Sequence, residues 1–146
     1  MKKKVKVANM ENFKKEITVD SKIENVALLT SFVESALEPY KPSMKAQMQI
    51  NVAIDELFSN IVHYSKSENM TLVLEVNEDF LTASLTFIDR GFAYDPLAKD
   101  DPDVTLSAEK REVGGLGIFL VKKTMDDVEY HREGDKNILK VVKKMA

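Results

Sequence analysis

Apolar and polar residues alternate along residues 13–19, where Phe13, Ile17 and Val19 occupy apolar positions. A period of two residues predicts a β-strand with one buried face. Two longer segments follow, in which apolar residues recur every three or four positions. That spacing predicts amphipathic helices, so this part of the chain is expected to form a strand followed by two helices.

Signals for helix ends delimit both predicted helices. Ser21 and Glu24 have the spacing of a capping box, which predicts that the first helix opens at this serine. Two prolines, at positions 39 and 42, end it. Ser43 is the expected N-cap of the second helix, whose apolar stripe runs from Ala46 to Ile61.

Four β-rich segments follow in two pairs. Residues 70–77 and 81–88 are joined by a short polar turn, and residues 128–132 and 138–144 flank a turn that contains glycine. Two β-rich segments with such a connection predict a β-hairpin. We therefore expect two hairpins in this half of the chain.

Residues 92–113 show no regular apolar period and include two prolines and scattered charges. A stretch of this length without secondary structure is usually disordered or functional, and we expect a lid over a ligand. A further helix, ending near Asp126, is expected after it. The predicted elements make an α+β fold, a two-layer sandwich with a mixed, mostly antiparallel sheet.

The length of 146 residues is typical of one domain with its own hydrophobic core. The sequence has 44% hydrophobic and 31% charged residues, as soluble globular proteins do. A net charge of −3 gives no electrostatic basis for binding nucleic acid. The lack of cysteine excludes disulfides and thiolate chemistry, and no apolar run is long enough to span a membrane. We therefore expect a single cytoplasmic domain over residues 1–146, with no nucleic-acid or membrane partner.

Four of the five glycines lie in two short motifs, at Gly91 and at Gly114, Gly115 and Gly117. Glycine permits a close approach between the backbone and a ligand. The second motif leads into an apolar segment and is expected to open a helix, whose free amide groups suit a phosphate. A flexible hinge accounts for this motif about as well, because it lacks the P-loop lysine and a preceding strand.

Glu56 and Asn60 are four residues apart on the second predicted helix and so share one face. Mg²⁺ accepts an asparagine carbonyl oxygen as a ligand, and a carboxylate nearby can take a proton from an attacking hydroxyl. Asp89 ends a predicted strand, where it can accept a hydrogen bond from an adenine amino group while Gly91 lets the base lie close. Taken singly, such a pair is more often a solvated polar face of a helix, and an Asp-x-Gly motif is more often an ordinary turn.

The order of these motifs resembles that of the ATP-binding fold shared by DNA gyrase, Hsp90, histidine kinases and mismatch-repair ATPases, the GHKL superfamily. Residues 55–62 resemble its N box, residues 89–96 its first glycine box and residues 114–121 its second. Within this superfamily the chain is most similar to the small bacterial anti-sigma-factor serine kinases. The resemblance implies a Bergerat-type sandwich, in which helices cover one face of the sheet.

The resemblance also implies roles for individual residues. Glu56 would be the general base, and Asn60 would bind both Mg²⁺ and the nucleotide. Asp89 would receive the adenine amino group. The other nucleotide-binding positions lie in the two glycine boxes and are Gly91, Ala93, Gly115, Leu116 and Gly117.

Two positions depart from the family pattern. Ala93 stands where the first glycine box often has a second glycine. Tyr64 stands four residues after Asn60, where the family commonly has histidine, and His63 comes one position earlier. Neither change removes a group that the implied chemistry requires.

The implied activity is that of an ATP- and Mg²⁺-dependent serine/threonine protein kinase. Its implied substrate is an anti-anti-sigma protein of the STAS type, with a sigma factor as the other partner and a homodimer as the assembly. Three alternatives remain open: a module that sequesters a regulator without transferring phosphate, a detached histidine-kinase ATPase domain, and an α+β domain that binds no nucleotide.

Overall fold

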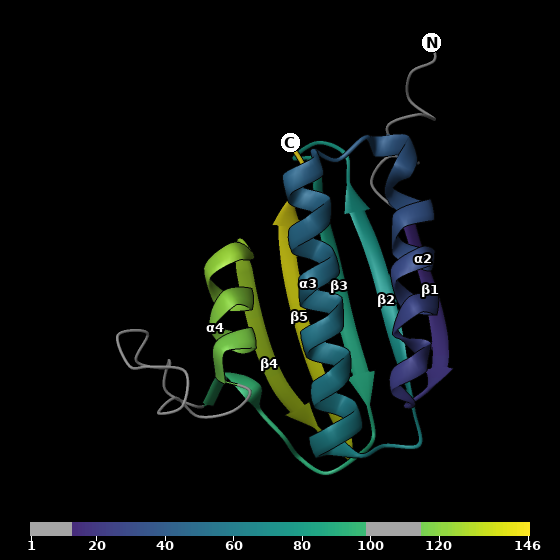
Figure 1. Cartoon of the computed structure of the whole chain (residues 1–146), viewed down its shortest axis with the longest axis vertical. Helices are drawn as coiled ribbons and strands as arrows, with labels where there is room; N and C mark the ends of the chain where they lie inside the picture. Colours follow the sequence, from purple (N-terminus) through teal and green to yellow (C-terminus); the bar gives the residue numbers. More distant parts are fainter. Residues whose placement is uncertain (1–12, 99–114) are drawn as a thin grey trace.

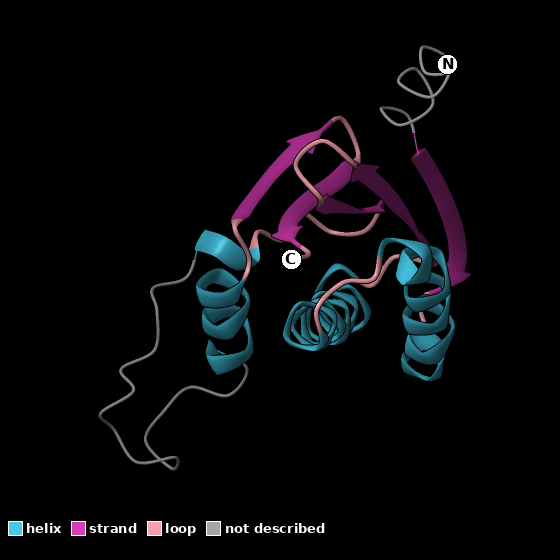
Figure 2. Cartoon of the chain, turned by 90° about the horizontal axis from the view of Figure 1, so that it is seen from above, coloured by secondary structure: helices cyan, strands magenta, loops and turns pink. Residues whose placement is uncertain are grey.

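The computed structural model describes residues 13–98 and 115–146, which form a five-stranded sheet with α-helices packed on one of its faces (Figures 1 and 2). The strand order is β1-β2-β3-β5-β4, and every neighbouring pair is antiparallel. The α+β sandwich with helices on one face is therefore confirmed. The expected mixture of parallel and antiparallel pairs is wrong for the described strands, because β5 turns back from β4 and inserts between β4 and β3.

Both predicted hairpins are confirmed, one formed by β2 and β3 and the other by β4 and β5. The strands are β1 (Phe13–Asp20), β2 (Asn69–Asn77), β3 (Thr82–Asp89), β4 (Asp127–Glu133) and β5 (Lys136–Lys144).

The described α-helices form the second layer. In Figure 1, α2 lies over β1, α3 crosses the middle of the sheet and α4 lies over the β4 edge. Their bounds are α2 (Val26–Leu37), α3 (Met44–Asn60) and α4 (Gly115–Thr124). The short helical turns are η1 (Ile23–Asn25), η2 (Glu38–Tyr40), η3 (Ile61–Ser65) and η4 (Pro96–Ala98). Within the described ranges, no helix combines the length and hydropathy needed to cross a lipid bilayer.

The start of the first helix differs from the prediction. Ser21 does not cap a helix, because its hydroxyl lies 3.3 Å from that of Ser67 and its backbone N–H donates to the carbonyl of Glu68 at 3.0 Å. The pairing of β1 with β2 thus continues one step past the strand and takes the groups that a cap would need. Ser43 does cap α3, since its side chain accepts a hydrogen bond from the N–H of Ala46 at 3.0 Å.

The C-terminal end of α3 widens into a π-helical turn, η3, where the sequence pattern predicts a simple helix end. Lys66 then reverses the chain in a left-handed conformation, with φ of 56°. This turn buries the side chain of Ser65, which is 2% exposed, beside the end of β3. Single π-helical turns are frequent at functional sites.

The hydrophobic core fills the space between the helices and the inward face of the sheet, with Ile54 of α3 and Leu85 of β3 fully buried in it. Among the described residues, the buried polar side chains are those of Ser65, Asp89 and Asn137. Burial of a polar group is costly unless that group is hydrogen-bonded. Their shared location therefore draws attention to the end of the sheet beside η3.

Candidate functional site

A pocket lies between the C-terminal half of α3 and the ends of β3 and β5. The space between its walls is about 300 Å³ when the adjoining open solvent is counted. Its walls are largely apolar with a few polar groups, the usual composition of a small-molecule site. The lining residues are Leu57, Asn60, Ile61, Ser65, Phe87, Asp89, Tyr94, Pro96, Tyr130, Asn137 and Leu139.

Glu56 of α3 lies against Gly117 in the first turn of α4. A side chain at Gly117 would overlap both carboxylate oxygens of Glu56. The absence of a side chain there is what permits this approach. Two residues predicted from separate motifs, 61 positions apart in the sequence, are thus brought together at the N-terminal end of a helix.

The environment of Glu56 raises the pKa of its carboxyl group. Partial burial is the main cause, because it disfavours the charged form, and the negative charge of the neighbouring Asp55 adds to it. A carboxylate with a raised pKa is a stronger proton acceptor than one in water. Such a shift in a partly buried acid beside a pocket is typical of a functional carboxylate.

Asn60 lies one turn further along α3 and contributes to the pocket wall. Its amide Nδ2 is buried and has no hydrogen-bond partner among the described residues. An unsatisfied buried amide is costly and uncommon in a native structure. The oxygen and nitrogen of an asparagine amide are distinguished only by their partners, so this end of the amide can offer an oxygen to a ligand. The side chain therefore fits the role of a group that is satisfied when a ligand binds.

Asp89 ends β3 and is 4% exposed. Its Oδ1 accepts hydrogen bonds from the N–H of Gly91 at 2.8 Å and from Nδ2 of Asn137 at 3.0 Å. The other oxygen, Oδ2, has no hydrogen-bond partner within residues 13–98 and 115–146. Asp89 thus lines the pocket with one oxygen held by the protein and the second available to accept a hydrogen bond from a ligand.

The sequence model of the histidine kinase-like ATPase domain family matches residues 19–143 of this chain. The chain belongs to that family. Serine-protein kinase RsbW of Bacillus mycoides is 28% identical over 132 residues, covering 86% of this chain and 82% of that protein. Serine-protein kinase RsbW of Listeria monocytogenes is 33% identical over 101 residues, covering 63% of each. A solved structure of RsbU and RsbW domains from Mycobacterium tuberculosis covers 91% of this chain and 32% of that one, with a TM-score of 0.66 at 12% identity, and so shares the fold.

In this histidine kinase-like ATPase domain, Gly91 serves the packing of the protein itself. A Cβ atom at Gly91 would collide with the carbonyl oxygen of Ser65 and lie 2.8 Å from the nitrogen of Ser67. The N–H of Phe92 donates to that same carbonyl at 2.8 Å. The glycine is therefore required by the close packing of β3's end on η3, a reason that the sequence did not indicate. Its contact with a nucleotide base stays a prediction.

The other predicted nucleotide-binding positions differ in how they lie relative to the pocket and to the start of α4. Gly115 is the first residue of α4, so the N–H groups of its first turn have no partner within the helix. The side chain of Leu116 is 40% exposed, while Ala93 is exposed and does not line the pocket. Gly114 and residues 99–113 of the expected lid lie outside the described residues.

Sequence reasoning missed several residues of this site, above all Asn137 and the aromatic pair Tyr64 and Tyr94. The two tyrosine rings stack with centroids 4.6 Å apart and planes inclined by 14°, and Tyr94 lines the pocket. Asn137 could have been noticed from strand alternation, because residues 137, 139 and 141 share the inward face of β5. No local signal indicates that Tyr64 and Tyr94, 30 residues apart, meet.

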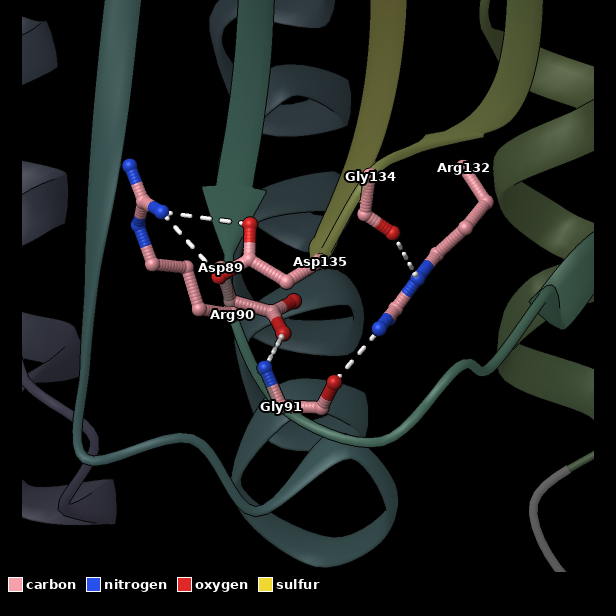
Figure 3. A network of polar contacts seen from close by, with 6 residues as sticks. All are labelled: Asp89, Arg90, Gly91, Arg132, Gly134 and Asp135. Carbon is pink, nitrogen blue, oxygen red and sulfur yellow. Dashed lines mark hydrogen bonds and ion pairs between the residues drawn. The ribbon is translucent and has the colours of Figure 1, made fainter.

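Arg90 and Arg132 connect the β4–β5 hairpin to the first glycine motif (Figure 3). Nη1 of Arg132 donates to the carbonyl oxygen of Gly91 at 3.0 Å. Arg90 contacts both carboxylate oxygens of Asp135 at 3.1 Å. The second pair is largely exposed to solvent, so we expect it to contribute little to stability.

Proposed function

We propose that this domain binds ATP with Mg²⁺ and transfers the terminal phosphoryl group to a serine or threonine side chain of a partner protein. The observation that carries this proposal is the contact of the Glu56 carboxyl group with Gly117 at the first turn of α4. It joins a proton acceptor with a raised pKa to a helix end whose free N–H groups suit a phosphate. The serine-protein kinase names of the RsbW relatives support the same activity.

The base of the nucleotide would occupy the pocket between α3 and the ends of β3 and β5. Apolar side chains such as Leu57 and Leu139 would contact its faces. Oδ2 of Asp89 would accept the hydrogen bond of the adenine amino group, because Oδ1 is already held by Gly91 and Asn137. This arrangement selects a ring that presents a hydrogen-bond donor at that edge.

The phosphates would lie between Asn60 and the first turn of α4. The N–H groups of Gly115, Leu116 and Gly117 would donate to phosphate oxygens, as helix N-termini commonly do. Asn60 would hold Mg²⁺ through its amide oxygen, which agrees with the unpartnered buried end of this side chain. When bound, Mg²⁺ neutralises charge on the phosphate oxygens.

Glu56 would act as the general base for transfer. Its carboxylate would accept the proton of the attacking hydroxyl while the oxygen–phosphorus bond to the substrate forms and the bond to the leaving ADP oxygen breaks. The protein contributes mainly by placing these groups and by offering fixed dipoles to the transferred phosphoryl group. By family resemblance, the substrate is an anti-anti-sigma protein of the STAS type, a sigma factor is a second partner, and the protein is a homodimer.

The test is phosphoryl transfer from γ-labelled ATP to the protein encoded beside this one, with Mg²⁺ present. Glu56→Gln should abolish transfer and leave nucleotide affinity within a few fold of the wild type. Glu129→Gln, on an exposed position of β4, is the matched control and should leave transfer unchanged. Transfer at wild-type rates by Glu56→Gln would reject this residue as the base. Binding of Mg-ATP with no transfer by the wild type would instead favour a sequestering module, and no binding would reject the proposal.

A further inference from the structure

The buried polar side chains of the described residues lie together at the end of the sheet beside η3. Ser65 is 2% exposed, and Asp89 and Asn137 are each 4% exposed. Asp89 and Asn137 face each other across the β3–β5 ladder. Since a buried polar group must find hydrogen-bond partners inside the protein, the bonds of this cluster show what holds it in place.

Asn137 makes the largest share of these bonds. Its Nδ2 donates to Oδ1 of Asp89 at 3.0 Å and to the carbonyl oxygen of Phe92 at 2.8 Å. Its Oδ1 accepts from the N–H of Tyr94 at 3.2 Å and from the hydroxyl of Tyr130 at 2.5 Å. Donors surround one end of the amide and acceptors the other, so the side chain has one satisfactory orientation.

These bonds act on one stretch of chain, residues 89–94, which we call the exit segment because it leaves the end of β3. Asn137 binds the carboxylate of Asp89 and the backbone groups of Phe92 and Tyr94 in this segment. Arg132 holds a fourth point, the carbonyl oxygen of Gly91 (Figure 3). The hairpin of β4 and β5 therefore clamps the exit segment, and Nδ2 of Asn137 also lies 3.5 Å from the hydroxyl oxygen of Ser65 in η3.

The consequence for Asp89 is a fixed rotation of its carboxylate. With Oδ1 held by Asn137 and by the N–H of Gly91, Oδ2 is the oxygen left for a ligand. Loss of the Asn137 amide would leave Oδ1 with a single donor and the exit segment without two of its backbone anchors. The carboxylate could then turn, and hydrogen bonding to a base would lose its preferred direction.

We propose that Asn137 is a positioning residue that orients Asp89 and clamps the exit segment, and that it thereby sets the preference of the pocket for an amino-bearing purine. This inference rests on the proposed nucleotide-binding function. Asn137 acts through Asp89 and requires no contact of its own with the nucleotide. Its effect is therefore expected on discrimination between bases, with little direct effect on the phosphates.

The measurement is the ratio of affinities for ATP and ITP, with Mg²⁺, by calorimetry. ITP carries a carbonyl oxygen where ATP carries the amino group, so the ratio reports the hydrogen bond to Asp89. A bond to a charged group of this kind supports a preference of about ten- to a hundredfold for ATP in the wild type. Asn137→Asp places a second carboxylate beside Asp89 and removes the donor, so we expect the ratio to fall to about one.

Matched variants separate positioning from general destabilisation. Val33→Ala, on the buried face of α2 and outside the pocket lining, should lower stability and keep the ATP-to-ITP ratio of the wild type. Asn137→Ser is the second variant, to be used if Asn137→Asp does not fold.

Hydrogen exchange of the nucleotide-free protein tests the clamp without any ligand. Asn137→Ser removes the oxygen that accepts the hydrogen bond from the N–H of Tyr94. With the wild type as the reference, exchange of this N–H should be at least tenfold faster in Asn137→Ser than in Val33→Ala. Equal protection of Tyr94 in both variants, or an unchanged ATP-to-ITP ratio in the Asn137 variants, overturns the inference. A wild type that binds ATP and ITP equally also overturns it. A wild type that binds neither rejects the proposed function, and the exchange result then decides the clamp alone.

Discussion

The carboxyl group of Glu56 occupies the space where the side chain of residue 117 would lie, so a glycine there is a condition for the position of this acid. Glu56 comes from the C-terminal half of α3, and Gly117 from the first turn of α4. The contact joins a candidate proton acceptor to a candidate phosphate-binding helix end. It also makes the consequences of substitution at both residues predictable.

Gly117→Ala should separate activity from stability. Alanine is favoured over glycine within helices by about 1 kcal/mol, so the free energy of unfolding should be unchanged or higher. The new methyl group would displace only the flexible end of Glu56, yet that displacement moves the carboxylate away from its site. We expect phosphoryl transfer to fall at least tenfold, measured beside chemical denaturation. A variant with full transfer would show that the position of Glu56 is unimportant.

Gly91→Ala should behave in the opposite way. The methyl group would collide with the backbone carbonyl of Ser65, which cannot rotate aside as a side chain can. Overpacking of this kind costs about 1–3 kcal/mol of unfolding free energy. Urea denaturation of Gly91→Ala and Gly117→Ala in parallel should show a loss for the first variant only. Equal stability of the two would contradict the packing of β3's end on η3.

The raised pKa of Glu56 predicts a pH dependence of both rate and stability. As a general base it acts when ionised, so the transfer rate should fall as pH drops through a midpoint above the ordinary value of 4.5. Because the folded state holds this proton more tightly than the unfolded state, ionisation of Glu56 lowers stability as pH rises through the shifted pKa. Glu56→Gln should therefore raise the melting temperature slightly at neutral pH, and the gain should disappear below the ordinary pKa. A gain that grows in acid would contradict the burial of this carboxyl group.

Asp89→Asn should weaken ATP binding at least tenfold, because an amide nitrogen at the position of Oδ2 would face the adenine amino group. Calorimetry with Mg-ATP is the measurement, and circular dichroism checks the fold. Asp135→Asn is the matched control, since this exposed carboxylate of the β4–β5 turn pairs with Arg90, the residue that follows Asp89. That control should change affinity less than twofold. Equal losses in both variants would point to loop geometry as the cause.

The tyrosines offer an optical signal of binding, because the chain has four tyrosines and no tryptophan. Tyr94 and Tyr130 line the pocket, and Tyr64 stacks on Tyr94. We expect Mg-ATP to change tyrosine emission, and Tyr94→Phe should remove a large part of the change. Tyr40 packs on Phe13 far from the pocket, so Tyr40→Phe should keep it. A response that depends on Tyr40 would place the nucleotide elsewhere.

Short-range patterns in the sequence were sufficient for most elements of the fold. The period of two predicted the strands, the spacing of three and four predicted α3, and the serine at position 43 predicted its start. The order of Glu56, Asn60, Asp89 and the glycines indicated the family to which the chain belongs. These features are local, because a helix face or a turn depends on residues a few positions apart.

Tertiary structure alone decided how the elements meet. The sequence did not show that β5 inserts beside β3, and so it did not place Asn137 against Asp89, 48 positions away. The same long-range packing took Ser21 away from its expected role as a helix cap and pressed Gly91 onto Ser65. Which strands pair, and in which register, depends on the packing of the whole sheet and on chain closure over long distances, and no local pattern encodes that choice.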